Sequence, residues 1–266
     1  MALARADLES LLRARRLDRT LTTLSGADLD TDSNRDLSQV QDPCAMLAPP
    51  GVAALDARLS GGFPRGQLSE IVGARSSGRT SLLLRMLAAA TERGELVALV
   101  DALDTLDVAS AEAAGIHLDR LLWVRGHVVS NPGLCRDMNQ RAIEQAVRAF
   151  ALVLQAGNFG VVALDVADAP ADAIRRLPFT TWLRLQRLIE GGQTAGVLVG
   201  TDPMARSSAG LTLRLGVREP GRGAPGIRFG PRLFDGFDID ARVIRARARA
   251  QEDATVGFQT LAAWDA

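Results

Sequence analysis

The sequence predicts an α/β domain built on a mainly parallel, twisted sheet with helices on both faces. Short apolar runs alternate along the chain with longer segments of helical periodicity, as expected of strands joined by crossover helices. Two runs, at 96–100 and 160–164, are apolar throughout, which is typical of strands buried on both faces. A glycine-rich segment, 73–80, joins a further predicted strand to a leucine-rich helix.

Apolar periodicity and glycine or proline stop signals place the individual elements. Gly61 and Gly62 end one predicted helix and Gly157 ends another. The segment 240–250 has an extended pattern, and the alternation within it at 245–250 fits either a strand with arginines on one face or a helix with arginines around it. Helices are predicted at 1–17, 51–59, 80–92, 105–114, 134–156 and 180–190, and strands at 67–72, 96–100, 121–124, 160–165, 196–200, 211–215, 227–229 and 255–261.

The chain divides into an N-terminal helix with a flexible arm (1–50), a core (51–219) and a C-terminal extension (220–266) of strands or mixed structure. Leu8, Leu11 and Leu12 lie on one side of the first helix. An isolated helix of this length is marginal in water, so it docks on its own core or on a second copy. Self-association through this helix is therefore one expectation.

Composition excludes several classes of protein. The 266 residues carry 31 basic and 31 acidic side chains, and every basic residue is an arginine. A net charge near zero predicts no strong intrinsic affinity for DNA. Cys44, Cys135, His117 and His127 show no metal-ligand spacing, so no metal site is expected. The absence of a long apolar run or an export signal predicts a cytoplasmic protein without a membrane partner.

The segment from Gly73 to Thr80 has the spacing G-x-x-x-x-G-K-[ST] of a phosphate-binding loop, with Arg79 in place of lysine. Backbone N–H groups and the start of the following helix point at the anion in such a loop. A guanidinium is larger and planar, so this replacement is not conservative. Because the chain contains no lysine at all, a general drift of composition toward arginine is the alternative cause. The candidate nucleotide-site residues are Gly73, Ser76, Ser77, Gly78, Arg79, Thr80 and Asp165.

Asp165 follows a buried strand, the position from which a carboxylate holds magnesium in nucleotide hydrolases of this type. The alternative is a structural or capping aspartate, since many apolar strands end in one. Its order after the glycine loop and after the strand that ends at Asp101 favours the metal role.

These motifs together resemble the core of the RecA recombinases. The segment 51–80, GVAALDARLSGGFPRGQLSEIVGARSSGRT, is similar to the family's "LD..LGGGLPRG" followed by "EI.GPESSGKTT". Residues 100–104, VDALD, are similar to "IDAEHALD", and 163–165, ALD, to "VVDS". The resemblance covers residues 51 to about 215 and implies a RecA-like core.

The departures from the family pattern affect hydrolysis. The resemblance places the catalytic glutamate on Leu103, which cannot act as a base, and the phosphate-sensing glutamine near Thr201 or Asp202. Together with Arg79 they predict that the protein is not an enzyme, and that no cofactor is required. Weak binding of ATP and magnesium without turnover stays open, because the loop glycines are present.

The resemblance also places two DNA-binding loops, at 166–179 and 201–210, both shorter than in the recombinases. Arg175, Arg176 and Arg206 are the candidate DNA contacts, because each arginine that neutralises a phosphate adds to affinity. A solvated charged surface is the alternative for all three.

A core of this length with an altered phosphate loop and an arginine-rich tail resembles the ImuA family. That resemblance implies an accessory protein of damage-induced translesion synthesis, with an ImuB-type polymerase-like protein, a DnaE-type polymerase and RecA as partners, and DNA contacted directly or through the complex. A functioning RecA-type ATPase and a SulA-like division inhibitor are the alternatives. The candidate ImuB contacts, which otherwise finish the sheet, are Arg242, Val243, Ile244, Arg245, Arg247, Arg249, Phe258 and Trp264.

Overall fold

A computed structural model describes residues 46–127, 136–205, 209–218, 227–228, 235–246 and 255–260. Several predicted features lie outside these residues, so their structure is not discussed. They are the first helix with Leu8, Leu11 and Leu12, most of the 1–50 arm, both cysteines, and Arg206, Arg247, Arg249 and Trp264.

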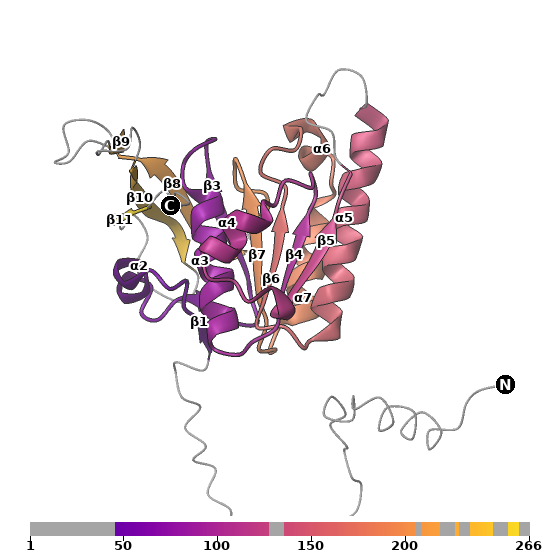
Figure 1. Ribbon diagram of the computed structural model, residues 1–266. Helices are drawn as coiled ribbons and strands as arrows, with labels where there is room; N and C mark the ends of the chain where they lie inside the picture. Colours follow the sequence, from indigo (N-terminus) through magenta and orange to yellow (C-terminus); the bar gives the residue numbers. More distant parts are fainter. Residues whose placement is uncertain are drawn as a thin grey trace, which may run out of the picture. The chain divides into compact units, whose positions relative to one another are not determined.

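Helices and strands alternate through the core, which confirms the predicted fold class (Figure 1). The elements are β1 (Leu47–Ala48), α2 (Ala53–Arg58), β2 (Phe63–Pro64), β3 (Leu68–Gly73), α3 (Arg79–Glu92), β4 (Val97–Asp101), α4 (Val108–Ala113), η2 (Leu118–Arg120), β5 (Leu121–Arg125), α5 (Arg136–Ala156), β6 (Val161–Asp165), α6 (Ala171–Arg175), α7 (Phe179–Ile189), β7 (Ala195–Gly200), β8 (Ala209–Val217), β9 (Ile227–Arg228), β10 (Gly236–Ala246) and β11 (Thr255–Gln259).

The main sheet has the strand order β11-β10-β8-β3-β7-β6-β4-β5, with β9 beside β10. Neighbouring strands from β8 to β5 are parallel, whereas β10 and β11 are antiparallel to their neighbours. The parallel strands therefore end at one common edge of the sheet, called the carboxyl edge here, where ligands bind in open α/β sheets. Gly73, Asp101, Asp165 and Gly200 all lie at the ends of their strands on this edge.

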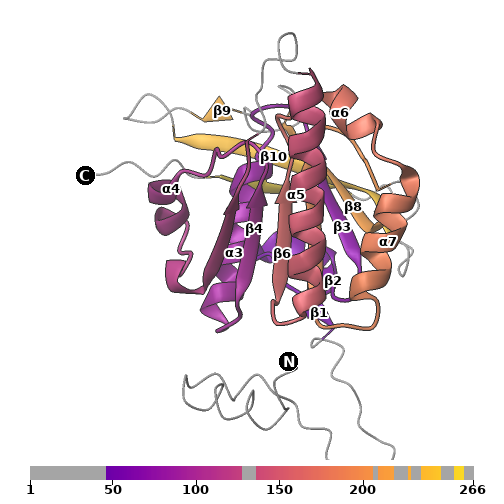
Figure 2. The same ribbon diagram turned by 90° about the vertical axis from the view of Figure 1, so that its right-hand side faces the viewer.

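Two apolar cores cover the two faces of the sheet. One contains buried side chains of α2, α3 and α4, such as Leu55, Leu83 and Ala111. The other contains side chains of α5, α6 and α7, such as Phe150 and Trp182. Figure 2 shows α5 lying across the front of the strands, with α7 beside it and α4 on the opposite side.

Helix α5, with 21 residues, is the longest described helix, and its surface is clearly divided. Ile143 and Phe150 are fully buried, whereas Arg141 and Arg148 are exposed. Such an amphipathic helix covers a sheet face. None of the helices in the described part of the chain has the length and apolar character needed to cross a bilayer.

Strands β7 and β8 both pair with β3 in parallel, on its two sides, so the chain crosses over β3 between them. The described part of this connection, 201–205, contains no helix and is held by the side chain of Glu70. Glu70 is fully buried in β3; its Oε1 accepts hydrogen bonds from the N–H groups of Met204 (2.7 Å) and Ala205 (2.8 Å). Its Oε2 accepts one from the Thr212 hydroxyl at 2.8 Å.

The segment 240–246 is extended, as predicted, and lies in β10. Of the segment 245–250, whose pattern fits both a helix and a strand, the two described residues, Arg245 and Ala246, belong to this strand. Strand β10 extends the core sheet, and Val243 and Phe258 are buried in the core shared with α3. The backbone pairing of β10 with β8 explains why this segment is a strand, because the edge of β8 offers N–H and C=O groups that an extended chain can pair with. The C-terminal extension therefore completes the main sheet.

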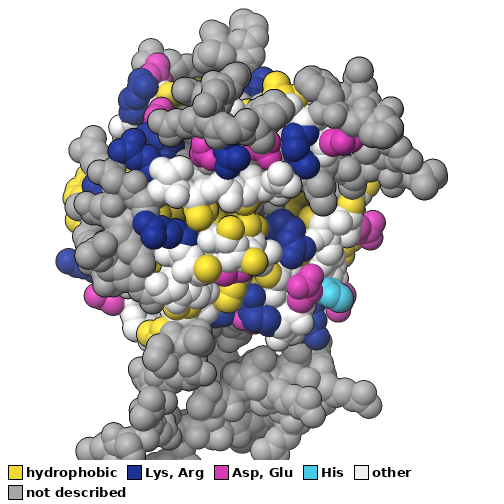
Figure 3. Space-filling model, turned by 90° about the vertical axis from the view of Figure 1, so that its left-hand side faces the viewer, with side chains coloured by type: hydrophobic (Ala, Val, Ile, Leu, Met, Phe, Trp, Pro, Cys, Tyr) yellow, Lys and Arg dark blue, Asp and Glu magenta, His cyan; other side chains and the backbone are white. Residues whose placement is uncertain are grey.

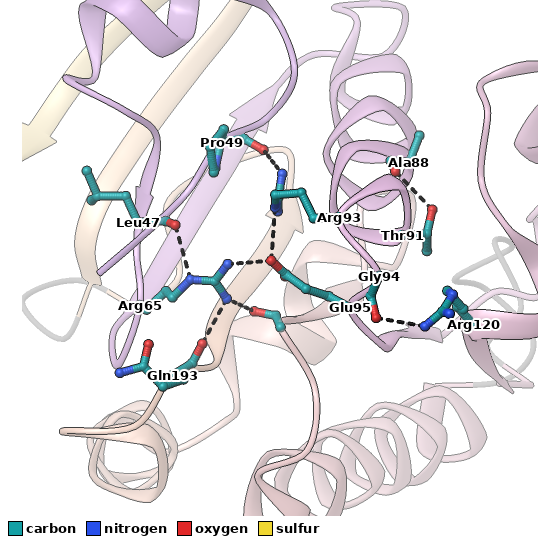
Figure 4. A network of polar contacts seen from close by, with 11 residues as sticks. Leu47, Pro49, Arg65, Ala88, Thr91, Arg93, Gly94, Glu95, Arg120 and Gln193 are labelled. Carbon is teal, nitrogen blue, oxygen red and sulfur yellow. Dashed lines mark hydrogen bonds and ion pairs between the residues drawn. The ribbon is translucent and has the colours of Figure 1, made fainter. Parts of the chain in front are cut away.

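Arg65 ties together the opposite edge of the sheet, called the amino edge here, as Figure 4 shows. Its guanidinium donates to the carbonyls of Leu47 (3.1 Å), Gly160 (3.1 Å) and Gln193 (2.9 Å), and to Oε1 of Glu95 (2.7 Å). These acceptors belong to β1 and to the segments that enter β4, β6 and β7. One side chain thus fixes four connections at this edge.

Candidate functional site

The loop between β3 and α3 has the backbone of an anion site. Ser76 and Gly78 both have left-handed φ values, 60° and 86°, which curl the chain so that N–H groups face inward. Gly73 has no room for a side chain, because an added Cβ would lie 2.5 Å from the Leu215 carbonyl oxygen. Helix α3 then starts at Arg79 with no acidic residue in its first turn and no side-chain cap. Its N-terminal N–H groups therefore remain available to an anion.

Arg79 lies in this loop with a guanidinium that is only partly bound. The side chain is 6% exposed, and its Nη2 lies 3.7 Å from Oδ1 of Asp168. Its Nη1 is buried and has no hydrogen-bond partner among the described residues; the same holds for Oγ of Ser77. Buried polar atoms without a partner are costly, so these are the two atoms of the loop that a bound phosphate or an ordered water would satisfy.

Asp168 is the acidic residue that faces the cations of the loop. Besides Arg79 it contacts Arg75, whose Nη2 lies 3.5 Å from Oδ2 of Asp168. Arg75 is 78% exposed, so this second ion pair is screened by solvent. Sequence reasoning missed Asp168, because nothing in the local pattern distinguishes it from an ordinary loop aspartate.

Asp101 and Asp165 are paired in register at the ends of β4 and β6. Oδ2 of Asp101 accepts hydrogen bonds from the Leu106 N–H (2.8 Å) and from Nε1 of Trp123 (3.3 Å), and Oδ1 accepts one from the Thr105 hydroxyl (3.4 Å). These three donors make Asp101 a structural group that holds the chain after β4.

Asp165 is the less satisfied of the two carboxylates. Its Oδ1 accepts one hydrogen bond, from the Ala167 N–H at 2.9 Å. Burial raises the pKa of Asp165 to about 6, helped by the charges of Asp101 and Asp168 and opposed by the Ala167 hydrogen bond and Arg79. A carboxylate whose charge is penalised in this way gains most from a nearby cation.

Oxygen groups that suit Mg²⁺ lie around the loop, with Asp165 opposite it and the Thr80 hydroxyl at the start of α3. The described residues contain no group of three or more His, Cys, Asp or Glu side chains arranged to hold a metal ion. A magnesium ion bound here would therefore take oxygen atoms of a bound phosphate as further ligands.

A hollow of about 230 Å³ opens beside the loop. Arg79, Asp165 and Asp168 line it. Several leucines line it as well, among them Leu103, the residue at the position of the recombinase glutamate. The further lining residues are Thr80, Leu83, Leu84, Leu99, Asp101, Thr105, Leu106, Asp107, Ser110 and Ala167.

A second hollow, of about 310 Å³, lies at the same carboxyl edge between the segments that follow β6 and β7. Phe179, Trp182 and Met204 line it, with Arg175 and Asp202 among its polar residues. It lies within the two segments predicted as DNA-binding loops. Neither Thr201 nor Asp202, at the predicted glutamine position, contributes to the first hollow.

The predicted DNA contacts and ImuB contacts are only partly on the surface. Arg175 and Arg176 are exposed on and after α6, and Arg175 pairs with Asp172 at 3.1 Å. Val243 (1% exposed) and Phe258 (8% exposed) are core residues, so neither is accessible as a contact in this chain. They complete the sheet because their side chains face α2 and α3, which leaves Arg242, Ile244 and Arg245 for the predicted contact.

Figure 3 shows the side of the molecule that carries α2 and β9 to β11. The arginine side chains visible there are separated by hydrophobic, acidic and uncharged groups. Arg218 pairs with Asp240 at 2.9 Å and Arg228 lies 3.7 Å from the buried Asp238, so part of this charge is neutralised within the sheet.

A parallel sheet with a glycine loop at the end of β3 defines an α/β protein with a P-loop-type phosphate site. Comparison with known proteins narrows this class. The family model for the RecA N-terminal domain matches residues 31–170, and the chain belongs to this family.

Similar proteins support the same relationship. RecA of Methylococcus capsulatus is 39% identical over 124 residues, which are 46% of this chain and 32% of that protein. RecA of Desulfotalea psychrophila is 35% identical over 120 residues, 45% of this chain and 30% of that protein. The chain thus spans about a third of the length of the curated relatives that it matches. A crystal structure of the RadB recombinase has the same fold, with a TM-score of 0.55 at 18% identity, covering 80% of this chain and 96% of that one.

These comparisons contradict the prediction that the protein is not an enzyme. The similar proteins are named RecA and RadB recombinase. That prediction had rested on three positions: Arg79, Leu103 and the glutamine position near Thr201 or Asp202. The structure gives the physical reason for the error. The loop backbone, its cation and the carboxylate Asp165 are all in place, so the replacements alter the site without removing it.

Proposed function

We propose that this RecA-family chain is a DNA-dependent ATPase that binds Mg²⁺–ATP in the 73–80 loop. The observation that carries the proposal is the buried Nη1 of Arg79, which has no hydrogen-bond partner within the described part of the chain, at the uncapped N-terminus of α3. Both features suit a polyphosphate, because it brings several negatively charged oxygens to neighbouring donors.

The residues of the proposed site have different roles. The loop N–H groups and Arg79 bind the phosphates, and the Thr80 hydroxyl and Asp165 hold magnesium, which supplies charge neutralisation at the phosphates when it is bound. Asp101 keeps the segment after β4 in place through its three hydrogen bonds. Leu103 cannot orient water, so we expect a slow reaction.

ATP binding measured by calorimetry, together with phosphate release in the presence and absence of single-stranded DNA, tests this proposal. We expect the wild type to bind and hydrolyse ATP slowly, and Arg79→Ala to lose binding while it keeps its circular dichroism spectrum. Leu103→Glu should raise kcat by about a hundredfold, since a positioned base contributes at least that much. Leu103→Gln is the matched control, because it adds a polar side chain of similar size without a base. The proposal is wrong if the wild type binds no ATP.

The DNA partner belongs to the same proposal. Arg175 lines the second hollow, and Arg176 follows it in the chain. Both side chains are exposed, so they can reach a phosphate backbone. Replacing both with alanine should lower the affinity for single-stranded DNA and reduce its dependence on salt by about two counterions. Unchanged salt dependence would assign these arginines to the solvated surface.

The resemblance to the ImuA family supports a second, finer role: an accessory protein that recruits an ImuB-type protein and a DnaE-type polymerase in the cytoplasm. Leu103 favours this role, because a chain with slow hydrolysis suits regulation of a partner better than rapid turnover. The measurement is binding to an ImuB-type protein by the wild type and by Arg242→Ala/Arg245→Ala, both of which carry the complete sheet. Equal binding by the two would exclude this strand as the contact.

A further inference from the structure

Asp168 lies where the phosphate loop and the second hollow meet. Its two carboxylate oxygens face Arg75 (3.5 Å) and Arg79 (3.7 Å), the cations of the loop. It borders the first hollow, and the next residue in the chain, Ala169, lines the second one. No other acidic residue in the described chain forms an ion pair with either arginine.

The carboxylate of Asp168 stands in for the anion that the loop is built to bind. Both ion pairs are long for charged groups, and Nη1 of Arg79 stays unpartnered, so Asp168 satisfies the loop only in part. A phosphate carries more charge and more acceptor oxygens, and it would repel a carboxylate held beside the same cations. Phosphate and Asp168 therefore compete for Arg79.

The segment that carries Asp168 also shapes the second hollow. Val166 donates its N–H to the Val199 carbonyl (3.1 Å), and Ala169 donates to the Val166 carbonyl (3.0 Å), so Asp168 sits in a short turn after β6. Val166, Ala169, Ile174 and Leu177 of this segment line the hollow. Displacement of Asp168 from the loop would thus move one wall of that hollow.

We infer that Asp168 is an internal competitor of the nucleotide phosphate, and that its release on nucleotide binding loosens the segment 166–177. The inference rests on the proposed function, since it concerns regulation of the same site. Without nucleotide, the ion pair between Arg79 and Asp168 would link the phosphate loop to the segment that lines the second hollow. The energetic coupling between two sites of this kind is reciprocal, so a ligand in the second hollow would also change the affinity for nucleotide.

The test compares Asp168→Asn with the wild type in the full chain. Removing the charge should tighten ATP binding about tenfold, a typical size for such coupling. Asp172→Asn is the matched control, because Asp172 is exposed in α6 and pairs only with Arg175 in the described chain. Hydrogen exchange followed by mass spectrometry reports on the segment: ATP should speed exchange in 166–177 of the wild type, and Asp168→Asn should show fast exchange without ATP.

The outcomes separate the inference from the function on which it rests. Equal ATP affinity in wild type and Asp168→Asn overturns the inference and leaves the proposed function intact. A large loss of kcat in Asp168→Asn, with unchanged affinity, also overturns it, because Asp168 would then act on the reacting groups. Failure of the wild type and both variants to bind ATP overturns the proposed function itself. Circular dichroism of each variant shows that the fold is kept.

Discussion

Two buried arginines at opposite edges of the sheet have opposite surroundings. Arg65, at the amino edge, donates from all three of its guanidinium nitrogens to four acceptors at 2.7–3.1 Å. Arg79, at the carboxyl edge, has one ion pair at 3.7 Å and a nitrogen with no partner in the described chain. Their exposed fractions are similar, 10% and 6%, so burial does not distinguish them.

The carboxylates beside the two arginines differ in the same way. Burial alone would raise the pKa of Glu95, but hydrogen bonds from Arg93 and Arg65 outweigh it and lower that pKa. The pKa of Asp165 is raised instead, because burial and neighbouring acids outweigh its single hydrogen bond and Arg79. The fully used guanidinium of Arg65 marks the amino edge as structural, although Oε2 of Glu95 has no hydrogen-bond partner in the described chain. At the carboxyl edge it is the cation itself, Arg79, that keeps a donor for a ligand.

The largest expected effect compares Arg65→Ala with Arg79→Ala. Arg65→Ala should lower the free energy of unfolding by about 3–5 kcal/mol, because three backbone carbonyls lose this donor and the partly buried Glu95 keeps only Arg93. Arg79→Ala should cost less than about 1 kcal/mol, because it removes an unsatisfied donor and leaves Asp168 partly exposed to water. Urea denaturation measures both, with the exposed Arg58→Ala as control. Equal losses for the two variants would contradict the distinction between the edges.

A second prediction concerns pH and Asp165. A pKa raised from 3.8 to about 6 means that the folded protein holds this proton more tightly than the unfolded chain. The folded state is then penalised as pH rises through this window, by roughly 3 kcal/mol when the carboxylate is fully charged. Asp165→Asn should therefore be more stable than the wild type above about pH 7 and equally stable below about pH 4. Denaturant unfolding at both pH values, without nucleotide, measures this difference, and a constant offset would refute it.

The smallest expected effect is that of Glu70. Unlike Asp165, Glu70 is a buried carboxylate with hydrogen bonds to both of its oxygens. Glu70→Gln should cost about 1–2 kcal/mol, since an amide cannot accept all the hydrogen bonds that the carboxylate accepts. Exchange of the Met204 and Ala205 amides should become faster, because the crossover over β3 loses part of its anchor. Glu190→Gln, at an exposed position after α7, is the control. Unchanged exchange at Met204 would show that other contacts hold the crossover.

Much of the fold could be predicted because the deciding signals are local. The strands at 68–73, 97–101, 161–165 and 195–200 are apolar runs between polar or glycine-rich segments, and each was predicted to within two residues. The phosphate loop was found because its glycines must occupy fixed positions, and the structure gives Gly78 its left-handed φ. Asp165 was found because it ends a buried strand.

The missed features depend on tertiary contacts. Asp168 looks like any loop aspartate until the fold brings it to Arg79. Glu70 had one usable signal, an acidic residue within an otherwise apolar strand, but its partners are 134–142 residues away in sequence. The pattern of the segment 245–250 fits helix and strand equally, and at Arg245 and Ala246 only the pairing with β8 decides between them.

The position of β10 and β11 has a consequence for the solubility of shortened forms. The first five of the nine residues of β8 are buried, and β10 pairs with residues 211–217 of this strand. A chain cut at Pro220 would present that strand as a long, flat and apolar edge, a template for pairing with further chains. The natural border is instead β11, which is five residues long and mostly exposed. We therefore expect the last 46 residues, 221–266, to keep this protein from aggregating, whatever else they bind.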